Sequence, residues 1–171
     1  MAWSDLIRRR HPASRVTAVE VAASLAEVIV QNTNTLRARI EVEGFTRMDP
    51  VRAGSDECLL ECMIFEWFLR DVMASVRSEG PVEAVRRALA GRLLVDLLRS
   101  GCSVPELDYL DRRQHDRFEE YEQALEVSAS LQPLGALAWR RISGDGQPSE
   151  RMTMLLAIRA RAELAQSLAL E

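Results

Sequence analysis

One stripe of charged residues on the predicted helix over residues 104–129 combines a histidine with carboxylates. Its members recur at i, i+3, i+7, i+11 and i+14, which places them on one side of a helix: Asp108, Asp111, His115, Glu119 and Glu122. A histidine between carboxylates suits divalent-cation binding or general-base chemistry. A single helix gives poor metal geometry, however, and the only other histidine is His11. We therefore predict no metal site and interpret the stripe as a solvated acidic face, with docking of an arginine-rich surface as the functional alternative.

A second candidate is a pair of carboxylates one turn apart, Glu57 and Glu61, on the predicted helix over residues 55–78. Glu61 projects between Phe65 and Phe68, where the helix is otherwise apolar. A buried carboxylate either pairs with a cation or has its pKa raised. Two interpretations follow. Glu61 forms a structural ion pair with an arginine of another helix, or it is an acid in a pocket lined by Glu57, Glu61, Phe65 and Phe68. We favour the ion pair.

Two more charged residues on this helix, Glu66 and Arg70, are spaced i, i+4. Oppositely charged residues at this spacing are neighbours on a helix surface and commonly form exposed pairs. We therefore predict a plain surface pair. Asp96 has Arg92 and Arg99 within helical reach and is given the same interpretation.

The motifs of several catalytic classes are missing. All 22 basic residues are arginine, so a P-loop lysine and a Schiff-base lysine are excluded. The sequence contains neither a Gly-x-Ser-x-Gly elbow nor a GxGxxG loop. Cys58 and Cys62 are spaced i, i+4, which is not a zinc-knuckle spacing, and Cys102 is distant, so we expect buried or free thiols. We predict no catalytic residue, no metal and no cofactor.

The N-terminus is the one basic part of the chain, with Arg8, Arg9 and Arg10 at its centre. Residues 1–14 are predicted to be a partly ordered segment; contact with acidic lipid, nucleic acid or the acidic stripe of a second subunit is the alternative. The net charge of −4 argues against nucleic-acid binding. The apolar stretch over residues 16–30 contains Glu20 and Glu27, which a signal sequence would not, and no run is long enough to span a membrane. We expect a cytoplasmic protein.

Glycines and prolines divide the rest of the chain into helix-length segments without strand-like alternation. The prediction is an all-α, single-domain bundle of about six helices over residues 15–171, with the helix over 55–78 buried at its centre. The other helices are expected over 15–43, 81–100, 104–129, 131–142 and 149–169. Leucines of the 81–100 segment point in several directions, so this helix is also expected to be well covered.

These observations favour a protein that acts by association and not by catalysis. The helices have apolar residues on more faces than one small bundle can cover, which suggests a homo-oligomer such as a homodimer, or an adaptor or regulatory protein with another partner. The alternative is a small-molecule-binding protein or enzyme with a pocket inside the bundle near Glu61.

Overall fold

The computed structural model describes residues 17–44, 48–76, 82–144 and 147–168. These residues form α-helices and no strand, which confirms the all-α prediction. The helices of the described ranges are α2 (Ala18–Gly44), α3 (Pro50–Ala53), α4 (Asp56–Val76), α5 (Val82–Arg99), α6 (Val104–Glu126), α7 (Gln132–Ser143) and α8 (Glu150–Leu168).

The helix bounds agree with the sequence-based ones to within a few residues, except that α3 was not predicted. A single turn is too short to show a hydrophobic period. Its start has local signals nonetheless, because the Asp49 carboxylate accepts a hydrogen bond from the Val51 N–H at 2.8 Å and Pro50 occupies the first helical position. The predicted basic segment around Arg8, Arg9 and Arg10 lies outside the described residues.

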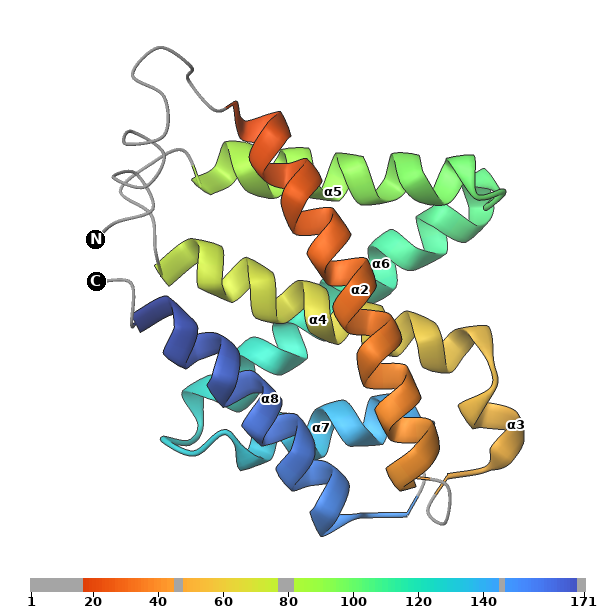
Figure 1. Ribbon diagram of the computed structural model, residues 1–171, viewed down its shortest axis with the longest axis vertical. Coiled ribbons are helices and arrows are strands. Elements are labelled where there is room, and N and C mark those ends of the chain that lie inside the picture. Colours follow the sequence, from red (N-terminus) through yellow and green to blue (C-terminus); the bar gives the residue numbers. More distant parts are fainter. Residues whose placement is uncertain (1–16, 45–47, 77–81, 145–146, 169–171) are drawn as a thin grey trace.

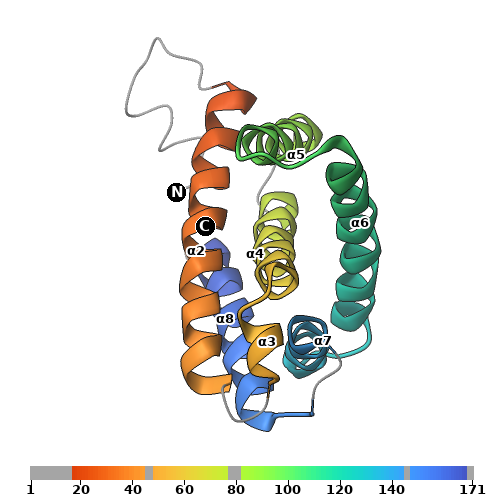
Figure 2. The same ribbon diagram turned by 90° about the vertical axis from the view of Figure 1, so that its right-hand side faces the viewer.

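The helix α4 runs through the middle of the molecule, with α2 on one side of it and α6 on the other (Figures 1 and 2). It contacts every other helix of the described chain. A helix that is apolar nearly all the way round must be covered on all sides to be stable. The predicted central position of this helix is confirmed, and its buried apolar residues include Cys58, Cys62, Ile64, Phe65, Trp67, Phe68 and Leu69.

The buried side chains form two clusters. The larger joins α4 to α6, α7, α8 and the C-terminal half of α2. The smaller lies where α2 crosses α5, and includes Ile29, Trp67 and Leu89. Met63 and Phe118 pack against both clusters, so the two are continuous.

The helices α7 and α8 approach each other closely at Gly135. A Cβ atom at this position would lie 2.3 Å from the Thr153 carbonyl oxygen and 3.0 Å from the Ala157 nitrogen. Both are backbone atoms, which side-chain rotation cannot move. Glycine is therefore the residue that lets these two backbones touch.

Candidate functional site

Glu61 is completely buried on α4, and its carboxylate is paired with two arginines of α6. Arg113 Nε donates to Oε1 at 2.7 Å, and Arg117 Nε lies 3.1 Å from Oε2. The two arginines are one helical turn apart, so both guanidinium groups face α4. Both carboxylate oxygens therefore accept hydrogen bonds from cationic groups. This arrangement is the structural ion pair with another helix that the sequence favoured.

The Glu61 ion pair belongs to a closed circuit of alternating charges that connects α3, α4, α6 and α7, which we call the Glu61 network. Arg52 closes the circuit by donating to the backbone carbonyls of Arg141, at 3.0 Å, and Ile142, at 3.1 Å. These carbonyls lie at the negative end of α7, where a cation is stabilising. Among the described residues, the side chains of the network in order are Arg52, Glu57, Arg113, Glu61, Arg117, Glu120 and Arg141.

The aromatic residues of the candidate pocket pack beside this network. The rings of Phe65 and Phe68 have centroids 5.8 Å and 5.1 Å from that of Tyr121. Burial, and next the negative charge of Glu61, raise the pKa of Tyr121 well above its ordinary value, so the phenol stays protonated. The structure thus brings Glu57, Glu61, Phe65 and Phe68 into one region, as paired carboxylates beside packed rings.

The predicted surface pair of Glu66 and Arg70 is wrong. Glu66 is completely buried and binds Arg159 of α8 through two hydrogen bonds of 3.0 Å and 2.7 Å. Arg70 pairs instead with the buried Glu163 of α8, at 3.1 Å. Burial raises the pKa of Glu66, and the hydrogen bond from Arg159 opposes that rise. On a helix that is covered all round, the partners of a charged residue are on other helices. The other predicted helical pair, Arg92 with Asp96, is present at 2.8 Å and partly exposed.

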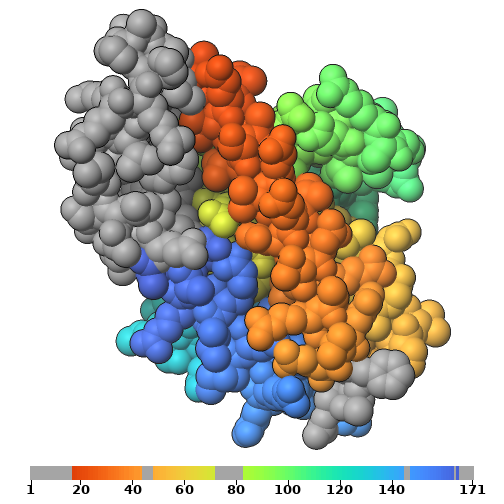
Figure 3. Space-filling view, viewed as in Figure 1, coloured from red at the N-terminus to blue at the C-terminus, as the bar shows by residue number. Residues whose placement is uncertain are grey.

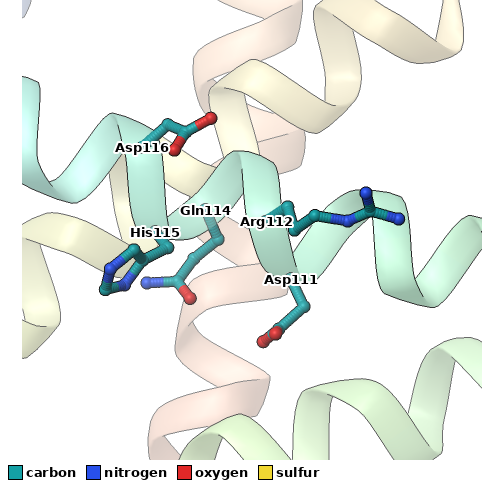
Figure 4. A pocket seen from close by; sticks show the side chains of 5 residues that line it. All are labelled: Asp111, Arg112, Gln114, His115 and Asp116. Carbon is teal, nitrogen blue, oxygen red and sulfur yellow. The ribbon is translucent and has the colours of Figure 1, made fainter.

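The candidate docking stripe lies along the outer side of α6, and all five of its residues are exposed: Asp108, Asp111, His115, Glu119 and Glu122. His115 Nε2 lies 3.6 Å from Glu119 Oε1, and both side chains are in solvent. A shallow hollow beside the stripe is lined by one turn of α6 alone. Its side chains point in different directions and do not converge on a common point (Figure 4). This arrangement gives no enclosed site for a small ligand, and the stripe stays a hypothesis for protein docking.

Four leucines of α5 pack inside the fold, as expected: Leu89 and Leu93 belong to the smaller cluster, and Leu94 and Leu97 pack against the larger one. Leu89 and Leu93 are buried against α2 and α4, whereas Val95 is 42 % and Leu98 46 % exposed. These two exposed residues continue a series at spacings of 4, 3, 4 and 3 residues along the opposite side of α5. We call the exposed members of this series the outer α5 face: Ala84, Gly91, Val95 and Leu98 are exposed, whereas Ala88 packs against the smaller buried cluster.

No family model, curated protein or solved structure matches the chain. None of the helices in the described ranges has both the length and the apolar character that a membrane crossing requires. The same part of the chain contains no group of three or more His, Cys, Asp and Glu side chains arranged to hold a metal ion.

The three cysteines are free thiols, of which Cys58 and Cys62 are buried and Cys102 is half-buried. A hydrogen bond between the two buried thiols lowers the pKa of Cys58 and raises that of Cys62, and burial raises the latter further. Reaction with an alkylating reagent requires both an ionised thiol and access to it.

We expect Cys102 to react with iodoacetamide in the native protein roughly a hundredfold faster than Cys58 and Cys62, which must wait for an opening of the fold. Pulsed alkylation followed by peptide mass spectrometry measures the three rates separately. A Cys102→Ser variant should then show almost no labelling until denaturant is added. Fast labelling of Cys58 or Cys62 in the native variant would contradict the burial described above.

Proposed function

We propose that the protein acts by associating with other protein chains, in the first place with a second copy of itself, and not by catalysis. The observation that supports this most is the outer α5 face. Val95 and Leu98 are large apolar side chains at helical spacing, and they are 42 % and 46 % exposed. Regular apolar rows on an exposed helix are typical of helix–helix association between chains.

The alternative, a ligand pocket at Glu61, has less support. A functional carboxylate needs an oxygen free to face a substrate, whereas both oxygens of Glu61 are bound by Arg113 and Arg117. The buried carboxylates Glu66 and Glu163 are likewise paired with arginines of neighbouring helices. Buried charges that pair in this way usually position helices relative to each other.

The experiment is a measurement of molar mass against concentration by light scattering or sedimentation equilibrium. We expect the mass to rise from 19.3 kDa towards twice this value. The midpoint should lie in the micromolar range up to about 100 µM, because one exposed helix face gives a small interface. A constant monomer mass over this range would overturn the proposal.

Replacing Leu98 by glutamate is expected to keep the protein monomeric, since it places a charge beside Val95 at the C-terminal end of the apolar row. The matched control is Val127→Glu, because Val127 is 83 % exposed and lies beyond the end of α6. The control should associate like the original protein. Circular dichroism and the unfolding midpoint show whether both variants retain the fold. Equal dimerisation of the two variants would exclude the outer α5 face.

A further inference from the structure

We infer that the basic segment around Arg8, Arg9 and Arg10 of one copy docks on the acidic stripe along α6 of a second copy. The inference rests on the self-association proposed above and adds a second contact to it. Because residues 1–16 lie outside the described residues, only their charge and the length of chain enter here. One chain therefore supplies both halves of the contact.

The carboxylates of the acidic stripe have no arginine partner in the part of the chain that the structure describes. Arg112, an exposed arginine beside them on α6, donates to the backbone carbonyl of Asp108 at 3.2 Å and not to a carboxylate. The charged contact within the stripe is that of His115 with Glu119, at 3.6 Å. Carboxylates three or four residues apart repel each other and destabilise a helix, so cations placed along this side would stabilise α6.

The basic segment complements the stripe in charge. Residues 1–15 contain four arginines against Asp5, which gives a net charge of +3, whereas the four carboxylates of the stripe give −4. Guanidinium groups bind carboxylates through two parallel hydrogen bonds. The apolar residues correspond as well. Val104 is 64 % exposed, four residues before the first carboxylate of the stripe, and the segment has Trp3 and Leu6 to cover it.

The length of the segment favours the stripe of a second copy over that of the same chain. Arg10 is seven residues before Thr17, so the two Cα atoms are at most about 25 Å apart. In the fold, α4 separates α2 from α6, and the stripe is on the outer side of α6 (Figure 2). Two helix spacings and the radius of α6 add up to about 25 Å through the core. A path around the surface is longer, so the arginines of one chain do not reach along its own stripe.

Both parts of the contact lie next to α5, the helix proposed to self-associate. The first turns of α2 (red) and the helix α5 (green) are neighbours on the surface of the molecule (Figure 3), and Ala22 and Leu89 belong to the same buried cluster. At the other end of α5, the helix α6 begins at Val104, five residues after Arg99. Association through α5 therefore brings the segment that precedes α2 in one copy and α6 of the other to the same interface. A mutual exchange of segments is repeated about a two-fold axis and closes as a dimer.

Binding of a synthetic peptide tests the contact. The peptide has the sequence of residues 1–16 and a fluorescein label. The acceptor is the full chain with Arg8→Gln, Arg9→Gln and Arg10→Gln, so that its own segment does not compete. Fluorescence anisotropy is expected to give a Kd on the order of 10–100 µM at about 0.05 M salt, and at least roughly tenfold weaker binding at about 0.5 M salt, because salt screens the contact. A peptide with glutamate at positions 8–10 should not bind.

Neutral variants of the acceptor locate the binding surface. Asp111→Asn combined with Glu119→Gln should weaken peptide binding roughly tenfold, because two of the four carboxylates are lost. The matched control is Glu27→Gln combined with Glu83→Gln, which removes two exposed carboxylates from α2 and α5 and should leave binding unchanged. Circular dichroism shows whether both variants retain the fold. Equal binding by the two double variants, or no binding to the parent acceptor, would overturn the inference.

A disulfide trap distinguishes a second copy from the same chain. The full chain with Cys102→Ser receives Arg9→Cys and Asp111→Cys, and mild oxidation is followed by non-reducing electrophoresis. Contact between copies gives a linked dimer in which peptide mass spectrometry finds residue 9 bonded to residue 111. The control has Glu27→Cys in place of Asp111→Cys and should give at least roughly tenfold less of the corresponding bond. A linked monomer would show that the segment binds its own stripe, contrary to the inference.

The peptide assay also separates this inference from the proposed function. Leu98→Glu should leave peptide binding unchanged, because the stripe is on another helix, so failure of the peptide to bind counts against the stripe contact alone. A constant monomer mass counts against the proposed self-association. Phosphatidylserine vesicles and duplex DNA are the competing anionic partners of the labelled peptide. Tighter binding to either of them than to the protein would assign the segment to that partner and reject the stripe.

Discussion

Replacing Glu61 by alanine is expected to lower the free energy of unfolding by about 3–5 kcal/mol, the usual cost of removing one partner of a buried ion pair. The loss is large because Arg113 and Arg117 remain behind, only 18 % and 14 % exposed, without the charge that both of them share. Arg113 and Arg117 keep Glu57 and Glu120 as partners, but both lose the buried carboxylate that connects them to the middle of α4, and this loss loosens α6 from α4. Urea unfolding followed by circular dichroism measures the difference.

The matched control for this change is Glu57→Ala. Glu57 also binds Arg113, at 2.9 Å, but its side chain is 42 % exposed. Partly exposed pairs contribute about 1 kcal/mol or less, so this control should be almost as stable as the original protein. Glu61→Gln provides an intermediate case that retains the shape, in case the alanine variant does not fold. Equal losses in the free energy of unfolding at positions 57 and 61 would show that the stability contributed by a carboxylate of the Glu61 network does not depend on its burial.

Replacing Gly135 by alanine is expected to destabilise the protein by about 2–3 kcal/mol, as overpacking of a close contact does. The added methyl group would overlap the Thr153 carbonyl at 2.3 Å, so α7 and α8 must separate along their whole contact. The higher helix propensity of alanine offsets about 1 kcal/mol of the cost. Thermal and urea unfolding measure the net change.

Gly91→Ala is the control with the same chemical change in another helix interior. Its added methyl group meets nothing within 4 Å, so the propensity gain of about 1 kcal/mol should be the whole effect in the monomer. Both variants are measured at low concentration, where association contributes nothing. Opposite signs for the two glycines are the expected result, and a loss of stability at both would contradict the difference in packing.

Much of the fold follows from local patterns in the sequence. The central helix is identifiable because residues 59–69, apart from Glu61 and Glu66, are apolar nearly all the way round, and helix ends follow glycine, proline and capping residues. The pairing of Glu61 with an arginine was also predictable as a type of contact, from burial alone. Which arginines pair with Glu61 was not predictable, because the periodicity of one helix does not tell which other helix packs against that helix.

The error at Glu66 has a definite cause. The i, i+4 rule compares residues on one helix only, and Arg159 is 93 residues away in the sequence. The same helix had been predicted to be buried on several sides, and that prediction already argued against an exposed Glu66. The expectation for α5 holds for Leu89, Leu93, Leu94 and Leu97, which pack in or against the two buried clusters, whereas Leu98 is 46 % exposed.

The orientation of α6 has a consequence for the electric field around the molecule. The helix turns Arg113 and Arg117 inwards, where buried and half-buried carboxylates neutralise them, and leaves its acidic stripe in solvent. The potential outside α6 is therefore more negative than a net charge of −4 spread evenly would produce. Polyanions are repelled from this side, while cationic surfaces are drawn to it from within about 10 Å at moderate salt. Two copies approaching each other are accordingly steered away from α6 and towards their electrically neutral sides.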